Sequence, residues 1–258
     1  MPTPTPPEFL YFDCAGTLMH PAEPIGQVYA RTAAAFGIHS DPEEVRTRFR
    51  TAWKKALRPA YPHGPDENVD LAWWREIVRQ SLLPVPLVEN SRAISNPTLK
   101  SGSHGSSNDD HSGSGTGLGI SGPDAFEDCF QTLFRHYARP DAWRLYPEVR
   151  PVLEALRGRV RMGVLSNFDA RLYPLLDGHG LTPFFETIVI SSESAACKPD
   201  PAIFTRAAAM AGSPPPEDIL LAGDDELNDW RGGTAAGWRI FPLRRPDNTL
   251  ADLLTMVP

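Results

Sequence analysis

The chain has 258 residues, of which 41% are hydrophobic and 22% are charged, and its formal net charge is −7. This length and composition allow a buried core and one or two domains, and they exclude a fibrous or wholly disordered protein. Lys and Arg are scattered along a chain that is negative overall, so the basic face that a polyanion requires is missing. No nucleic-acid partner is therefore predicted.

Cysteine usage and the N-terminal sequence bear on the compartment. The three cysteines, Cys14, Cys129 and Cys197, form no C-x-x-C pair, which indicates neither a disulfide framework nor a structural zinc site. The opening MPTPTPPEF lacks the basic and apolar regions of a signal peptide, and no apolar run approaches the length of a membrane span. We expect a cytoplasmic protein with reduced thiols and no membrane partner.

Short apolar runs alternate with helical stretches over most of the chain. The first run is Phe9–Phe12, and the later runs lie at 162–165, 187–190, 219–222 and 239–243. Between these later runs, and before the first of them, helical patterns cover 147–157, 169–177, 200–211 and 226–236. This order is typical of βαβ units around a parallel sheet. It predicts a doubly wound, Rossmann-like α/β core formed by residues 1–19 and 141–258.

Residues 20–140 have a different, all-helical pattern. Apolar residues from Ile25 to Phe36 recur on one helical face, and a second helix is predicted from an Asp41 N-cap, with Pro42 in the first turn and Glu44 as capping-box acid, up to Pro59. Further helices are predicted at 71–82 and after an N-cap at Asp124. Because this unit follows the first strand, we expect an inserted α-helical cap over the sheet.

The cap is interrupted by a segment of unusual composition at residues 90–122. In residues 101–122, fourteen of twenty-two positions are Ser or Gly. Such a segment buries too little apolar surface to offset the entropy of ordering it. We interpret it as a disordered insertion within the cap.

Polar residues follow the predicted strands. Asp13 to Thr17 follow the first strand, Ser166 and Asn167 follow the second, Lys198 lies in a loop after the third, and Asp224, Asp225 and Asp229 follow the fourth. The carboxyl ends of parallel strands meet at one edge of a sheet, where ligands bind. Carboxylates with a lysine and a hydroxyl suit phosphoryl transfer, because carboxylate oxygens hold Mg²⁺ and the lysine offsets negative charge.

Four sequence patterns carry a family resemblance. D-x-x-G-T-L from Asp13, L-S-N around Ser166, K-P-D-P-x-I-F from Lys198 and G-D-D-x-x-N-D from Gly223 together resemble the four motifs of the haloacid dehalogenase-like (HAD) hydrolase superfamily. Segments such as VYARTAAAFGI and AAGWRIFPL also resemble one branch of this superfamily whose substrate is poorly defined.

The resemblance implies a role for each motif residue. Asp13 would be the nucleophile that forms an aspartyl-phosphate on a small phosphorylated metabolite. An Asp13 oxygen, the Ala15 backbone carbonyl, Asp224 and Asp229, with help from Asp225, would hold Mg²⁺. Three further residues would contact the phosphoryl group. Ser166 and Lys198 would be catalytic and substrate-binding residues, and Asn167 would bind through its backbone. Thr17 would brace the loop after the first strand, and we also predict it to be a substrate-binding residue.

Ala15 departs from the pattern. Phosphatases of the superfamily place a second Asp at this position, which protonates the leaving group, and such an acid is worth about 10²–10⁴ in rate. We therefore expect a slow phosphatase, or one limited to good leaving groups. The alternative is a non-catalytic or regulatory phosphometabolite-binding protein.

Two further chemistries fit the sequence less well. Phosphonatase relatives pair Ala with a cap lysine that forms a Schiff base, and Lys54 or Lys55 are candidates, although both read as solvated helix lysines. A haloacid dehalogenase would not require the acidic cluster of the fourth motif. The tryptophans Trp53, Trp73, Trp74 and Trp143 are expected to pack in the core or the cap rather than to contact substrate. Oligomeric state stays open.

Overall fold

A five-stranded parallel sheet forms the centre of the molecule. The computed structural model describes residues 5–61, 63–83 and 123–257. The strand order is β5-β4-β1-β6-β7, with all four neighbouring pairs parallel. The strands are β1 (Phe9–Phe12), β4 (Arg161–Ser166), β5 (Thr187–Ile190), β6 (Ile219–Gly223) and β7 (Arg239–Pro242). Each apolar run predicted as a strand is confirmed within one residue at each end.

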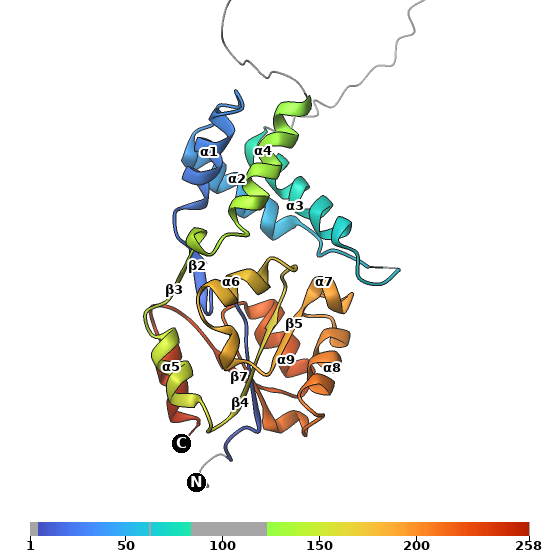
Figure 1. The fold of residues 1–258 in the computed structure, drawn as a ribbon. Coiled ribbons are helices and arrows are strands. Elements are labelled where there is room, and N and C mark those ends of the chain that lie inside the picture. Colours follow the sequence, from blue (N-terminus) through green and yellow to red (C-terminus); the bar gives the residue numbers. More distant parts are fainter. Residues whose placement is uncertain (1–4, 62, 84–122, 258) are drawn as a thin grey trace, which may run out of the picture.

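Helices cover both faces of this sheet, so the predicted doubly wound fold is confirmed. Successive residues of β1 point to opposite faces: Leu10 and Phe12 belong to one hydrophobic core, and Phe9 and Tyr11 to the other. Helices α5 (Val149–Leu156) and α6 (Leu172–Gly178) pack on the first face, and α8 (Pro201–Met210) packs on the second. Figure 1 shows α5 and α8 on opposite sides of the strands.

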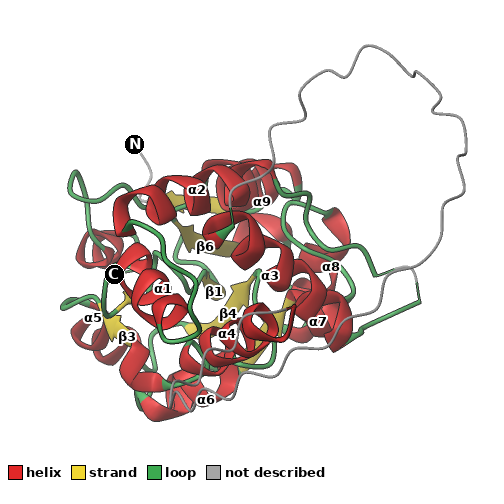
Figure 2. Cartoon of the chain, turned by 90° about the horizontal axis from the view of Figure 1, so that it is seen from above, coloured by secondary structure: helices red, strands yellow, loops and turns green. Residues whose placement is uncertain are grey.

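Four further helices stand beyond the carboxyl ends of the strands. They are α1 (Ile25–Ala34), α2 (Pro42–Lys55), α3 (Glu67–Leu82) and α4 (Pro123–His136). They share a hydrophobic core of their own, centred on residues such as Val28, Val78 and Phe130. In Figures 1 and 2 they lie over the end of the sheet where β1, β4 and β6 finish. The boundaries 1–19, 20–140 and 141–258 stay a prediction, and the segment 90–122 lies outside the described residues.

The chain passes from the sheet to the four helices and later returns, and the two connecting segments pair as a small antiparallel ribbon. Strand β2 (Met19–Pro21) pairs with β3 (Trp143–Leu145), and Met19 lies opposite Leu145 while Pro21 lies opposite Trp143. This ribbon is not among the predicted strands. Strands of three residues contain too few positions to show an alternating pattern.

Helix ends agree with the sequence in part. The Asp41 carboxylate caps α2 by accepting from the backbone N–H groups of Glu43 and Glu44 at 2.9 and 3.0 Å. The predicted capping box is wrong, because the Glu44 side chain accepts from Arg48 instead. Helix α2 also ends at Lys55 rather than near Pro59.

Three other features of the described chain bear on the predictions. Asp124 lies within the first turn of α4, not before it. The stretch predicted as one helix over 226–236 is a π-helical turn, Glu226–Arg231 (η4), followed by α9 (Gly232–Ala235). All three cysteines are free and buried, and no helix in the described part of the chain is long and apolar enough to cross a bilayer.

Candidate active site

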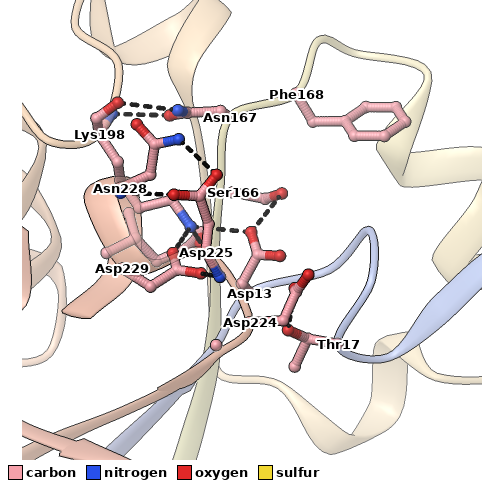
Figure 3. A network of polar contacts seen from close by, with 12 residues as sticks. Asp13, Thr17, Ser166, Asn167, Phe168, Lys198, Asp224, Asp225, Asn228 and Asp229 are labelled. Atoms are coloured by element: carbon pink, nitrogen blue, oxygen red, sulfur yellow. Dashed lines mark hydrogen bonds and ion pairs between the residues drawn. The ribbon is translucent and has the colours of Figure 1, made fainter. Parts of the chain in front are cut away.

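Four polar segments converge where the strands end. Asp13 directly follows β1, Ser166 is the last residue of β4, and Asp224 directly follows β6. Lys198 comes from the loop between α7 (Ser191–Ser194) and α8. Figure 3 shows these side chains pointing toward one another, so the structure brings together the residues that the four sequence patterns carry.

Lys198 is the centre of this cluster. Its Nζ donates to Asp13 Oδ1 at 2.8 Å, to Asp229 Oδ1 at 2.5 Å and to the Leu165 carbonyl at 2.8 Å, which uses all three N–H groups of the ammonium. Only 1% of Lys198 is exposed. Burial alone would lower the pKa of Lys198, but the carboxylates of Asp13 and Asp229 outweigh it and raise that pKa. The buried amine is therefore a fixed positive charge.

The Asn167 side chain holds the main chain of Lys198. Its Nδ2 donates to the Lys198 carbonyl at 2.9 Å, and its Oδ1 accepts from the Lys198 N–H at 2.7 Å. Both ends of the amide are thus engaged with one residue. This pairing leaves the backbone of Asn167, rather than its side chain, for the predicted contact with a phosphoryl group.

Asp13 has one oxygen engaged and one open. Oδ1 accepts from the Ser166 hydroxyl at 3.1 Å in addition to Lys198. Among the described residues, Oδ2 accepts no hydrogen bond, and Asp13 lines the cavity described below. A carboxylate that is oriented by two donors and exposes its second oxygen to a cavity is suited to nucleophilic attack or to metal binding.

Three carboxylates form an acidic group around the open oxygen. Ligand atoms of Asp13, Asp224 and Asp229 lie within 4.8 Å of one another. Desolvation, followed by the charge of Asp13, raises the pKa of Asp224 to about 6. Burial is also the largest cause that raises the pKa of Asp229, to about 7, although Lys198 acts in the opposite direction. One ammonium therefore leaves the negative charge of this group incompletely balanced.

The donor set fits a hard divalent cation. Carboxylate oxygens are the ligands that Mg²⁺ takes in proteins, usually one or two of them with water. Asp224 is oriented toward this group by Thr17, whose hydroxyl donates to Asp224 Oδ1 at 2.8 Å. Thr17 is fully buried, so its position is that of a bracing residue, and its predicted substrate contact does not follow from this geometry.

Asp229 and Asp225 are occupied within the protein. Asp229 is 0% exposed, and its Oδ2 accepts from the Asp225 N–H at 3.0 Å. The Asp225 side chain caps η4: Oδ1 accepts from the N–H groups of Leu227 and Asn228, and Oδ2 accepts from the Asn228 amide. The supporting metal role predicted for Asp225 therefore competes with a capping role that the structure shows.

Two glycines allow the close approach of these carboxylates. Gly16 has φ +95°, which an L side chain rarely adopts, and a Cβ on it would overlap the Asp224 carboxylate. A Cβ on Gly223 would overlap the Asp229 carboxylate in the same way. Neither position accepts a larger residue without displacing an aspartate of the acidic group.

Arg245, which is not among the predicted site residues, braces the first loop. Its guanidinium donates to the carbonyls of Gly16 and Thr17 at 2.8 and 3.0 Å and to Glu148 at 2.6 Å. It also lies 3.5 Å from the centre of the Tyr146 ring. No local pattern marks Arg245, because its partners lie far from it in the sequence.

A cavity of about 320 Å³ opens above the acidic group. Asp13, Ala15, Ser166, Lys198 and Asp224 line its floor, and side chains of α1–α4 line its walls. Ala15 is exposed there, at the position where other phosphatases were expected to carry a second carboxyl group. No histidine lines this cavity in the described residues.

The tryptophans and the cap lysines differ in their relation to this cavity. Trp53, Trp74 and Trp143 line it. Trp143 also belongs to a core of the sheet and Trp74 packs against the core of the four helices, so the expected packing is confirmed, and a contact with substrate stays untested. Trp73 packs behind them, 5.4 Å and 5.0 Å from the rings of Trp53 and Trp74. Lys54 and Lys55 are exposed and absent from the lining, as expected of solvated helix lysines.

Comparison with known proteins supports one family. Haloacid dehalogenase-like hydrolases match residues 10–237. Haloacid dehalogenase-like hydrolase domain-containing protein 3 of Danio rerio is 26% identical over 244 residues, which cover 94% of this chain and 87% of the fish protein. This likeness confirms the branch that the segments VYARTAAAFGI and AAGWRIFPL indicate.

Solved structures show the same fold at low sequence identity. A predicted phosphoglycolate phosphatase from Haemophilus somnus has a TM-score of 0.62 and 18% identity, with 98% of this chain and 99% of that chain covered. A defluorinating L-2-haloacid dehalogenase has a TM-score of 0.59 and 17% identity, with 94% and 86% covered. Because both chemistries occur on this fold, the reaction must be argued from the site. The chain belongs to the haloacid dehalogenase-like hydrolase family.

Proposed function

We propose that this hydrolase is a Mg²⁺-dependent phosphatase that acts on a small phosphorylated metabolite through Asp13. The observation that carries the proposal is the Asp13 carboxylate, which is oriented by Lys198 and Ser166 and stands beside two further carboxylates. A nucleophile with a fixed cation and an acidic group beside it suits transfer of a phosphoryl group.

The reaction follows from the positions of these groups. The Asp13 carboxylate attacks phosphorus, the bond from phosphorus to the ester oxygen breaks, and the organic alcohol leaves after its oxygen takes a proton from water. Water then attacks the phosphorus of the aspartyl-phosphate, and the bond from phosphorus to the Asp13 oxygen breaks. Inorganic phosphate is released, the Asp13 carboxylate is regenerated, and the proton lost by the attacking water neutralises the hydroxide left by the first step. Ser166 and the backbone at Asn167 donate to phosphoryl oxygens, and Lys198 offsets the negative charge that gathers on the transferring group.

The Mg²⁺ would be held by an oxygen of Asp13, the carboxylate of Asp224 and the carbonyl of Ala15. The fully buried Asp229 would add negative charge beside them. Bound there, Mg²⁺ supplies positive charge that neutralises the phosphate. The incomplete balance of charge among Asp13, Asp224 and Asp229 supports this assignment.

The acidic group also favours a phosphatase over a dehalogenase. A leaving halide is an anion, and the three clustered carboxylates would repel it unless a cation stood among them. Mg²⁺ held by these carboxylates would offset their charge and so favour the binding of a phosphoryl group. The second candidate is a protein that binds a phosphorylated metabolite without turnover, and the observation that favours it is Ala15, which offers no acid to the leaving group.

Phosphate release from a panel of phosphomonoesters, with Mg²⁺ and with the ion chelated, tests the proposal. We expect turnover that depends on Mg²⁺ and falls by at least about 10³-fold in Asp13→Asn, because the amide is not a nucleophile. Thermal unfolding of both proteins controls for folding. Full activity of Asp13→Asn or metal-independent turnover would overturn the proposal, and tight Mg²⁺-dependent binding without turnover would establish the second candidate.

A further inference from the structure

The walls of the cavity are aromatic where they face away from Asp13. Tyr29 and Phe49 come from α1 and α2, Trp53 from the end of α2, Trp74 from α3, Phe134 from α4 and Trp143 from β3, and all of them line the cavity. The carboxylates that line the cavity all lie on the floor, whereas the walls carry two arginines and tyrosine hydroxyls among the rings. A phosphomonoester with its phosphoryl group on Asp13 would therefore place its organic group among rings.

These rings are held in place by one another. The ring centres of Tyr29 and Phe49 lie 5.7 Å apart, those of Phe49 and Trp53 lie 6.0 Å apart and nearly parallel, and those of Trp53 and Trp74 lie 5.5 Å apart. Such distances are those of favourable aromatic pairs. The wall is thus formed before a ligand enters, and a flat apolar group gains contact without ordering these side chains.

Two guanidinium groups, those of Arg171 and Arg58, line the walls. Arg171 is held by Asp169 through two hydrogen bonds of 2.8 and 2.7 Å and lies 3.7 Å from the centre of the Phe134 ring. Arg58 stacks on Trp53, with its guanidinium carbon 4.7 Å from the ring centre. The charge of the first guanidinium is offset by Asp169, whereas the second keeps its charge and lies over the ring of Trp53.

Neutral hydroxyls are the remaining polar groups of the walls. The Tyr137 hydroxyl is buried and has no hydrogen-bond partner in the described residues. Burial raises the pKa of Tyr29 and of Tyr137, so both stay neutral. They match one or two hydrogen bonds of a ligand, but not the many hydroxyls of a sugar phosphate, whose burial without partners would weaken binding.

The missing acid at Ala15 points to the same class of ligand by an independent route. An alkyl alkoxide is a poor leaving group and requires protonation, whereas the oxygen of an aromatic alcohol leaves as a far weaker base. The exposed methyl of Ala15 gives no proton. A site without this acid works best on esters whose alcohol is aromatic.

We propose that the substrates are phosphate monoesters of small aromatic alcohols, whose ring is seated against Phe49, Trp53 and Trp74. This inference rests on the proposed function, since the phosphoryl group must sit on Asp13. It excludes compact substrates with a second charge, such as phosphoglycolate, and polyhydroxylated ones, such as glucose 6-phosphate, as preferred substrates.

The first experiment compares kcat/KM for 2-naphthyl phosphate, phenyl phosphate, benzyl phosphate, phosphoglycolate and glucose 6-phosphate with Mg²⁺ present. We expect the two aryl phosphates to exceed the last two by at least about 10²-fold, because both the ring contacts and the leaving group favour them. Benzyl phosphate, which has a ring but a poor leaving group, should bind like phenyl phosphate and turn over more slowly. A preference for phosphoglycolate or glucose 6-phosphate overturns the inference and leaves the proposed phosphatase function standing.

The second experiment assigns the ring contacts to the wall. Trp53→Ala and the milder Trp74→Phe should lower kcat/KM for 2-naphthyl phosphate about tenfold or more through KM, with a smaller effect on phosphoglycolate. Lys54→Ala, on the exposed side of α2, is the matched control and should change neither value. An equal loss on both substrates in the two tryptophan variants, with thermal unfolding unchanged, would contradict the inference.

A binding measurement separates the two proposals if no ester turns over. Calorimetric titration with 2-naphthylphosphonate and with phosphonoacetate, in the presence of Mg²⁺, reports the cavity without requiring catalysis. Binding of the naphthyl compound at least about tenfold tighter, lost in Trp53→Ala, supports the aromatic site even where the phosphatase function fails. Equal or reversed affinities overturn it.

Discussion

The floor and the walls of one cavity are held together in opposite ways. On the floor, every charged side chain has a fixed partner, and Lys198 alone joins Asp13, Asp229 and the Leu165 carbonyl. On the walls, rings such as Phe49, Trp53 and Trp74 are fixed by contact with other rings and contribute almost no charge. In the function proposed above, the strand ends would carry the chemistry and the helices would select the organic group.

Two buried carboxylates, one below the floor and one among the helices, differ in whether they have a partner of opposite charge. Asp229, below the floor, is fully buried and bound to Lys198. Asp70, on α3, is also buried, but only its Oδ1 has a partner, the Tyr61 hydroxyl at 2.7 Å, and its Oδ2 is buried without one in the described residues. A buried charge is stabilised by a partner of opposite charge and destabilises the fold without one.

Removal of the Lys198 ammonium should have the largest effect. Lys198→Met leaves Asp13 and Asp229 buried beside each other, so we expect the free energy of unfolding to fall by about 3–5 kcal/mol. Phosphate release should fall by about 10²–10³-fold, since a fixed charge at the reacting group is lost. Urea unfolding and a phosphate assay measure both effects.

The exposed Lys54→Met is the control for Lys198→Met and should change neither quantity. A loss of stability below about 1 kcal/mol in Lys198→Met would show that the aspartates of the floor do not require this partner, and the contrast between floor and walls would then fail.

A new acid on the floor should have the next largest effect. Ala15→Asp places a carboxyl group where the chain has only a methyl, and we expect turnover of benzyl phosphate to rise by about 10²-fold. Turnover of 2-naphthyl phosphate should rise much less, because its leaving group requires little protonation. Parallel measurements of kcat on the two esters check this difference. Equal gains, or a loss on both, would show that the leaving group does not limit this enzyme.

The Asp70 carboxyl tests the stability of the helical part through its pH dependence, because Asp70 lies on α3, the helix that carries Trp74. Burial is the largest cause that raises the pKa of Asp70 from 3.8 to about 6 in the folded protein. A folded-state pKa above the unfolded value means that the protonated form stabilises the fold below about pH 4 and that this contribution is lost as pH rises through 6. Asp70→Asn keeps an oxygen for Tyr61 but cannot ionise.

We therefore expect Asp70→Asn to become more stable relative to wild type by about 2 kcal/mol between pH 4 and pH 7.5. Urea unfolding at both pH values gives the difference. The same change at the exposed Asp177 should leave the difference near zero. A pH-independent difference for Asp70→Asn would mean that the protein solvates or pairs this carboxylate after all.

The sequence predicted the floor well, for a physical reason. Strands of a parallel sheet are buried on both faces, so runs such as FLYF and ILLAG stand out, and the residues after them must reach one edge. Asp13, Ser166 and Asp224 could be placed together on that ground alone.

The walls could not be predicted in the same way. An apolar helical stripe containing Phe49 and Trp53 looks the same whether it faces a filled core or a cavity, because periodicity gives the face of a helix and not what lies opposite. Arg245 escaped notice because it contacts Gly16 and Thr17 only after the whole sheet has formed. Its role depends on tertiary contacts that no local pattern encodes.

The ribbon of β2 and β3 provides a site for an internal deletion in the chain. Pro21 and Trp143 lie opposite each other in it, so the stretch between them leaves and re-enters the core at neighbouring points. A tight turn that joins these two residues would delete every helix of the walls and retain all five strands of the sheet. Asp13, Ser166, Lys198 and Asp224 all lie in the part that is kept, so one excision would separate these residues from the cavity-lining side chains of α1–α4, while Trp143 would stay with the sheet.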